Sequence, residues 1–178
     1  MEQLVKEYNG KVRVVFKNLV VHPQVVTRAH LAGCAAAKQG KFVAYKDAFW
    51  DKGFGPSKAT QGKDHSGFSD EGILKIAGEI GLDTARMKAD MDSDECKQRL
   101  SEDAGELGKF KVNSTPTFFI NGTPIAGALP LVEMRSIVDA QLQLVASSGV
   151  APAQYYAQQV MAKGEKTFRS KLDPKPKK

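Results

Sequence analysis

Two short apolar runs on either side of Asn121-Gly122 constrain the fold of this chain more than any other feature. Both residues of a tight two-residue turn need a positive φ, and Asn-Gly is a dipeptide that adopts this geometry readily. The flanking runs are Thr-Phe-Phe-Ile at 117–120 and Thr-Pro-Ile-Ala at 123–126. We therefore predict a β-hairpin with strands at 117–120 and 123–126, and the fold must contain it.

A second candidate strand lies near the start of the chain. Residues 12–17 read Val-Arg-Val-Val-Phe-Lys, and four of the six are apolar. This composition, rich in β-branched residues, is typical of a strand inside a sheet. Just before it, Leu4 and Tyr8 fit the last turns of a helix that ends at Asn9-Gly10. We expect a helix end followed by a strand.

Most of the remaining chain is predicted to be helical. Residues 53–67 hold four glycines and a proline without periodicity, so we expect a loop there. Aromatic side chains recur at helical spacing just before this stretch, and we expect them to line the core: Phe42, Tyr45, Phe49 and Trp50. Residues that favour helix starts predict helices beginning at or just after Pro23, Ser69, Asp83, Ser93, Pro130 and Pro152.

Composition excludes several classes of protein. Hydrophobic residues make up 42% and charged residues 26% of the 178 residues, as in ordinary globular domains rather than disordered or collagenous chains. No apolar run approaches the roughly 18 residues of a membrane span, so none is expected. Residues 1–8 mix charged and apolar side chains, so we expect no export signal in this chain.

The net charge of +6 is concentrated at the end of the chain. Seven basic and two acidic residues lie within 163–178, where Phe168 is the single aromatic residue. A nucleic-acid-binding face usually interleaves basic and aromatic residues, and this stretch does not. We expect a solvated tail and no nucleic-acid partner. The alternatives are an arm that binds phosphate groups, or an anchor to acidic partners or membrane surfaces.

The segment around the hairpin resembles that of a known family. Residues 114–122 read Ser-Thr-Pro-Thr-Phe-Phe-Ile-Asn-Gly, similar to the Thr-Pro-Thr-Phe segment of DsbA-like thiol:disulfide oxidoreductases with a thioredoxin fold. Further stretches occur in family order: Lys-Val-Arg-Val-Val-Phe-Lys-Asn at 11–18, His22-Pro23, Cys34-Ala35, Gln39-Gly40-Lys41-Phe42, Gly81-Leu82-Asp83 and Gly127-Ala128-Leu129-Pro130. The resemblance implies that Thr115 and Pro116 line the substrate groove, joined by a cis peptide bond.

The resemblance also implies an architecture. We expect an α/β (α+β) thioredoxin-like fold with an inserted helical subdomain, N-terminally truncated. The domain would occupy residues 1–146, with the helical insertion at about 23–108. A C-terminal helix is expected at 147–165, and a basic disordered tail at 166–178.

The chain departs from this family at its redox centre. Family members carry a Cys-x-x-Cys pair on a helix that precedes the strand matched by residues 12–17, and here that pair and the preceding strand are missing. Disulfide exchange needs a low-pKa thiolate with a resolving thiol beside it. We therefore expect no catalytic residue and no dithiol turnover. Three explanations stay open: a truncated or misassigned start, a pseudo-enzyme that keeps the groove for binding, or another cause.

The cysteines and histidines of the chain do not indicate a catalytic or metal site. Cys34 and Cys96, the two cysteines of the chain, are a candidate structural disulfide, since some relatives have a second, non-catalytic one; the alternative is two buried thiols. His22, His30 and His65 lack neighbours at zinc-site spacing, so we expect no metal. No dinucleotide fingerprint or phosphate loop is present, and no cofactor is expected.

Function is predicted from the resemblance. We expect a domain of a DsbA-like protein-disulfide oxidoreductase, acting in disulfide formation or isomerisation outside the cytoplasm, in the periplasm for example. Its partners would be proteins or peptides that carry thiols or disulfides. The alternative is a non-catalytic peptide-binding module that uses the Thr115-Pro116 groove. The missing strand would leave two strands unpaired, so we also expect homo-oligomers formed by strand exchange; the alternatives are direct pairing of the two remaining strands, or a strand supplied by a separate peptide.

Overall fold

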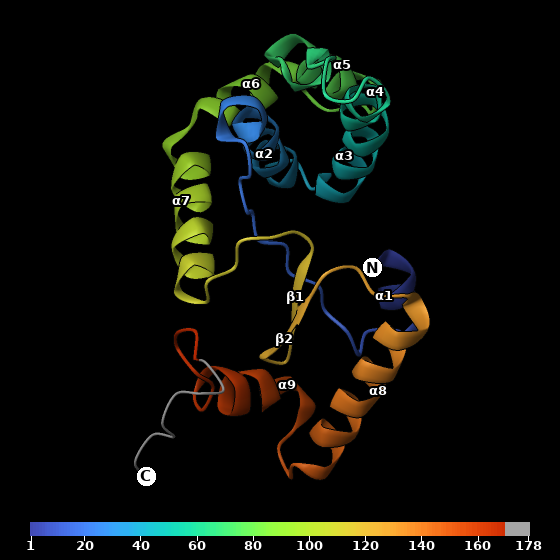
Figure 1. Ribbon diagram of the computed structural model, residues 1–178, viewed down its shortest axis with the longest axis vertical. Helices are drawn as coiled ribbons and strands as arrows, with labels where there is room; N and C mark the ends of the chain where they lie inside the picture. Colours follow the sequence, from blue (N-terminus) through green and yellow to red (C-terminus); the bar gives the residue numbers. More distant parts are fainter. Residues whose placement is uncertain (170–178) are drawn as a thin grey trace. The chain divides into compact units, whose positions relative to one another are not determined.

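The computed structural model describes residues 1–169 and divides the chain into two compact units (Figure 1). The terminal unit combines Met1–Lys17 with Glu106–Lys178, of which residues 170–178 are outside the described part. The helical unit is Asn18–Gly105. Each unit has its own hydrophobic cluster and is considered by itself.

The helical unit is built from helices packed around one core. Its elements are α2 (Pro23–Lys38), α3 (Phe42–Phe49), the π-helix η1 (Trp50–Phe54), α4 (Gly55–Ala59), the 3-10 helix η2 (Ser66–Phe68), α5 (Asp70–Glu79), α6 (Thr84–Asp92) and most of α7 (Asp94–Lys109). In Figure 1, α2 lies beside α6, although the two helices are far apart in the sequence. Ala32, Ile73 and Met87 are fully buried in the shared core.

Local capping explains where the helices of this unit begin. The Ser69 hydroxyl accepts a hydrogen bond from the Gly72 amide, and the Asp83 carboxylate accepts one from Arg86. Each bond satisfies a backbone N–H that the first turn leaves without a partner. The predicted helix starts at Ser69 and Asp83 are therefore confirmed.

The predicted loop at 53–67 is wrong in part. The π-helix η1, α4 and η2 occupy much of this stretch. The glycines are needed here because the backbone at Gly67 packs directly against the backbone at Gly53, and not because the chain is irregular. A Cβ on Gly67 would lie 2.5 Å from the Cα of Gly53. A sequence pattern cannot distinguish these two reasons for glycine.

The predicted aromatic core face is also wrong in part. Tyr45 is buried, but Trp50 is 65% exposed. Trp50 follows Tyr45 by five residues, which is about 140° further round an α-helix, so it leaves the face that Tyr45 buries. Its ring stacks instead on Phe54, with centroids 4.7 Å apart. The aromatic periodicity therefore places only the first part of this segment in the core.

The terminal unit contains the predicted hairpin. Strands β1 (Thr117–Ile120) and β2 (Thr123–Ala126) pair antiparallel, with Ile120 opposite Thr123. Asn121 and Gly122 have φ values of 47° and 85°, as the turn requires. The other elements are α1 (Glu2–Glu7), α8 (Leu131–Ser147), α9 (Pro152–Tyr155) and the π-helix η3 (Tyr156–Met161).

Residues 12–17 do not form the predicted strand. Among residues 1–169 the one sheet is β1–β2, and residues 12–17 run between α1 and α2 without regular structure (Figure 1). Val12 packs against the small cluster of Leu4, Met134 and Val138. β-propensity describes a fit to a pleated surface, but a strand also needs a neighbour for its backbone groups. That neighbour is absent among the described residues.

Part of the predicted tail lies in the described region. The Phe168 amide donates to the carbonyl of Lys109 at 2.7 Å, and the Lys111 ammonium lies 4.8 Å from the centre of the Phe168 ring. These contacts attach the chain near residue 168 to the end of α7. The remainder of the predicted tail, residues 170–178, is outside the described residues.

Candidate functional site

The loop before β1 is fixed at both of its ends. The Thr117 hydroxyl donates to the carbonyl of Ser114 at 2.8 Å, which closes the turn. The carbonyl of Pro116 accepts a hydrogen bond from the Gly127 amide at 2.9 Å, so the loop is tied to the end of β2. The Thr115-Pro116 peptide bond is cis. The loop is therefore held by the hairpin.

This loop presents free backbone groups to solvent. Residues 113–116 are all exposed. Within residues 1–169, the N–H and C=O of Thr115 have no hydrogen-bonding partner, whereas the carbonyl of the next residue, Pro116, is bonded to Gly127. A free donor and acceptor on one residue can pair with the main chain of an extended peptide. Thr115 is thus the candidate binding residue of the terminal unit.

The two cysteines form a disulfide inside the helical unit. Cys34 on α2 and Cys96 on α7 have Cα atoms 5.7 Å apart, within the range that a disulfide can bridge. The side chains are 7% and 0% exposed. Because these are all the cysteines of the chain, no thiolate remains for exchange while the bond is intact. The pair therefore has a structural role.

Residues 39–41 and the turn at 80–83 hold each other in place. The Gln39 side chain donates to the carbonyl of Asp83 at 3.1 Å and accepts from its amide at 3.0 Å. The Lys41 ammonium donates to the carbonyls of Ile80 and Gly81 at 3.1 and 2.9 Å. A cation there satisfies carbonyls at the C-terminal end of α5. These residues connect α2 and α3 to the α5–α6 turn.

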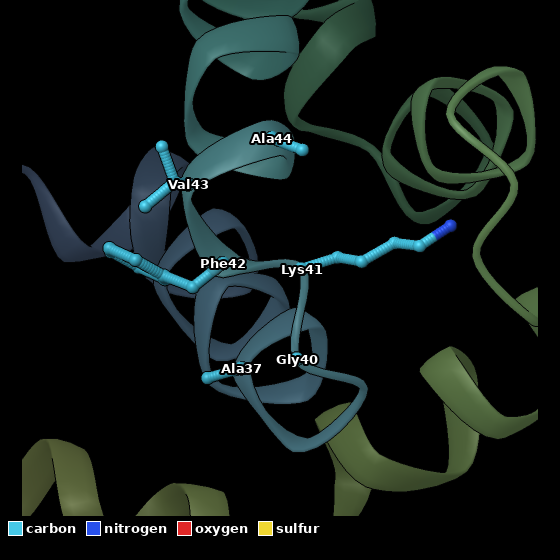
Figure 2. A pocket seen from close by; sticks show the side chains of 6 residues that line it. All are labelled: Ala37, Gly40, Lys41, Phe42, Val43 and Ala44. Carbon is cyan, nitrogen blue, oxygen red and sulfur yellow. The ribbon is translucent and has the colours of Figure 1, made fainter.

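A shallow hollow of about 570 Å³ lies beside this connection and is lined by residues 37 and 40–44. Figure 2 shows Lys41 extending to one side of it and Phe42 and Val43 to the other. The Lys41 ammonium is already bound to carbonyls, and the rest of the lining is apolar or glycine. A ligand site needs several converging polar groups, so this hollow is a weak candidate.

A buried hydrogen-bond network of Asp103, Asn18 and His30 was not predicted from the sequence. Asp103 is 5% exposed, and its carboxylate accepts from both the backbone amide and the side-chain amide of Asn18, each at 2.8 Å. The side-chain amide oxygen of Asn18, Oδ1, accepts in turn from Nδ1 of His30 at 2.9 Å, and burial lowers the pKa of His30. The available signal was spacing, since Asp103 follows Cys96 and Leu100 on one buried helix face.

Charged side chains of the helical unit are arranged in mutually satisfied pairs. Arg28 donates to both oxygens of Asp70 at 2.6 and 2.7 Å, and to Asp92 at 2.7 Å. The hydrogen bonds from Arg28 lower the pKa of Asp70. Among residues 1–169, no three His, Cys, Asp or Glu side chains gather as a metal site would require. This network stabilises the unit, and its three members are engaged with one another.

Within residues 1–169, every helix is either too short or too polar to cross a bilayer.

Comparison with known proteins identifies the family of the chain. A family model described as thioredoxin matches residues 1–140. The Na(+)/H(+) antiporter NhaA from Herminiimonas arsenicoxydans is 26% identical over 139 residues, which are 78% of this chain but 20% of the antiporter. The chain therefore spans about a fifth of that relative. No solved structure matches. With its mixed helices and small two-stranded sheet, the chain belongs to the thioredoxin family as an α+β, thioredoxin-like domain.

Proposed function

We propose that this chain is a DsbA-like member of its family that binds thiol- or disulfide-bearing protein segments without exchanging their disulfides. The observation that carries the proposal is Thr115, whose exposed backbone N–H and C=O have no partner among the described residues. An extended peptide segment pairs with such groups through its main chain, which makes binding tolerant of sequence.

The cysteine chemistry supports binding without turnover. Cys34 and Cys96 are joined and buried, so neither sulfur can attack or resolve a substrate disulfide. The parent activity of the DsbA-like family, disulfide formation or isomerisation, would need a dithiol that this sequence does not contain. The chain would act as a binding module for substrates of that class.

The disulfide also supports a location outside the cytoplasm. Structural disulfides persist in oxidising compartments such as the bacterial periplasm and are rare where thiols are kept reduced. We place the protein in the periplasm or another extracytoplasmic compartment. Recovery of the protein from periplasmic and cytoplasmic fractions, with the thiol state of Cys34 and Cys96 measured in each, tests this location.

A peptide with a matched chemical control tests the binding mode. The probe is a fluorescent extended peptide with one central S-methylated cysteine, compared with a twin that is N-methylated at the central amide. Loss of one main-chain hydrogen bond should weaken binding about five- to tenfold. Thr115→Val keeps the backbone groups and should leave the affinity for both peptides unchanged. Equal binding of the two peptides, or no binding of either, would overturn the proposal.

An activity assay tests the second half of the proposal. Reduction of insulin by dithiothreitol should proceed at the same rate with and without the protein. Acceleration by the unmodified protein that is lost in Cys34→Ser together with Cys96→Ser would contradict the assignment, because these two thiols would then carry the exchange.

A further inference from the structure

The two units differ in how completely they bury their apolar side chains. Fourteen buried residues form one cluster in the helical unit, whereas the described part of the terminal unit buries three: Leu4, Met134 and Val138. Of the twelve large hydrophobic side chains that are exposed among residues 1–169, nine belong to the terminal unit. The described elements of this unit thus leave much apolar surface uncovered.

The outer edge of β1 is open. Counted from the two-residue turn, the hydrogen-bonded pairs of the hairpin are Ile120 with Thr123 and Phe118 with Ile125, and at the base the Gly127 amide donates to the carbonyl of Pro116. Because the pairs alternate along an antiparallel ladder, Thr117 and Phe119 direct their N–H and C=O groups away from β2. Among residues 1–169, β1 has no other partner strand.

The two edges of the hairpin are not equivalent. Pro124 stands opposite Phe119, so a residue without an N–H occupies the outer edge of β2. β1 carries no proline and no charged side chain, the features that usually protect an edge from pairing. Phe119 is 43% exposed. The edge of β1 is therefore better suited than the edge of β2 to pair with an additional strand.

The same unit contains a segment suited to fill such an edge. Residues 12–15, the free segment, read Val-Arg-Val-Val and equal β1 in length. Within the described chain, their backbone groups make no hydrogen bond. Val15 is 64% exposed, while Val12 packs against the cluster that also receives Phe118 and Ile120. If the free segment formed a strand beside β1, Val12 would lie on the sheet face that carries Phe118 and Ile120, and Val15 on the opposite face with Phe119.

We propose that two copies of this chain pair reciprocally, with the free segment of each copy added as a third strand to the open edge of β1 in the other. Each chain offers one strand and one edge, so a twofold exchange satisfies both and leaves neither available for a third copy. The apolar exposed side chains Val15 and Phe119 would then cover each other. This pairing does not involve the Thr115 backbone and stands independently of peptide binding.

Sedimentation equilibrium of the unmodified protein provides the first test. A dimer is expected, with the mass rising from monomer to dimer over a concentration series and no larger species. A protein that remains monomeric throughout the series would overturn the proposal. If this monomer still bound the peptide probe, the proposed function would stand while the pairing failed.

Cross-linking identifies the strands that pair. Val15→Cys and Phe119→Cys are prepared as separate variants, one with an affinity tag, and treated with a short bismaleimide without reductant, so that the native disulfide stays unreactive. The mixture should give the mixed dimer, and each variant alone should not. A cross-link in Val15→Cys alone or in Phe119→Cys alone would overturn the assignment, because like segments would then be paired.

Two controls complete the design. Val132→Cys, on α8 and 64% exposed like Val15, should give no mixed dimer with Val15→Cys. The double variant Val15→Cys with Phe119→Cys should cross-link between chains. A cross-link confined to single chains would show that the free segment closes onto its own β1, which refutes exchange between copies.

Discussion

Breaking the Cys34–Cys96 disulfide should destabilise the helical unit more than any single side-chain change. The cysteines are 62 residues apart and the closed loop includes most of the unit. A cross-link of that length removes chain entropy from the unfolded state equivalent to about 4 kcal/mol. Both side chains are buried, so the variant that tests this is Cys34→Ala together with Cys96→Ala, which adds no polar group to the core.

The chain contains a convenient probe for this measurement. Its single tryptophan, Trp50, lies in the helical unit and loses its stacking on Phe54 when that unit unfolds. With a urea slope of about 2 kcal/mol per molar, the midpoint of Trp50 fluorescence should fall by about 2 M. Helical circular dichroism should follow the same transition, since α2 to α6 belong to this unit.

Reduction of the unmodified protein separates the cross-link from the packing of the sulfur atoms. Reduced protein keeps both sulfurs and loses only the bond, so its midpoint should fall nearly as far as that of the alanine variant. The alanine variant itself should be insensitive to reductant. The reasoning is refuted if reductant leaves the midpoint of the unmodified protein unchanged, or if two thiols titrate in the denatured, unreduced protein.

Three further perturbations report on the contacts around this core. Asp103→Ala should lower the free energy of unfolding by about 2 kcal/mol, because two amide groups of Asn18 lose a charged acceptor; Glu102→Ala, an exposed neighbour, should have little effect. Burial lowers the pKa of His30 in the folded state below its unfolded-state value of about 6.5. The stability that neutral His30 contributes is therefore fully present above a pH of about 6.5 and is lost as the pH falls through the lower, folded-state pKa. Urea midpoints at pH 7.5 and 5 should differ less in His30→Gln. Lys41→Met should cost about 0.5–1 kcal/mol by urea unfolding, because two carbonyls after α5 lose their cation.

Local features were predictable because their causes lie within a few residues. The hairpin at 117–126 follows from the backbone conformation of Asn121 and Gly122, which the two residues adopt whatever surrounds them. The helix starts at Ser69 and Asp83 follow from side chains that bond to amides of the next turn. In each case, no distant segment is needed to decide the outcome.

Features that depend on distant segments were not predictable in the same way. Residues 12–17 have the composition of a strand, but a strand forms only where another backbone lies beside it, and none does among the described residues. Trp50 was predicted to lie in the core together with its aromatic neighbours, but it lies five residues after Tyr45, off the buried face, and stacks on Phe54. The error at residues 12–17 arises because a pattern describes one segment at a time.

The sequence by itself determined the absence of a Cys-x-x-Cys pair, the turn at Asn121-Gly122 and the number of cysteines. Only the tertiary structure brought Cys34 and Cys96 to a Cα separation of 5.7 Å, and placed the Asp103 carboxylate on the amides of Asn18. It also left the backbone of Thr115 and one edge of β1 without partners among the described residues. The physical reason is that composition and turn geometry belong to a segment, whereas pairing depends on two segments that meet only in the folded chain.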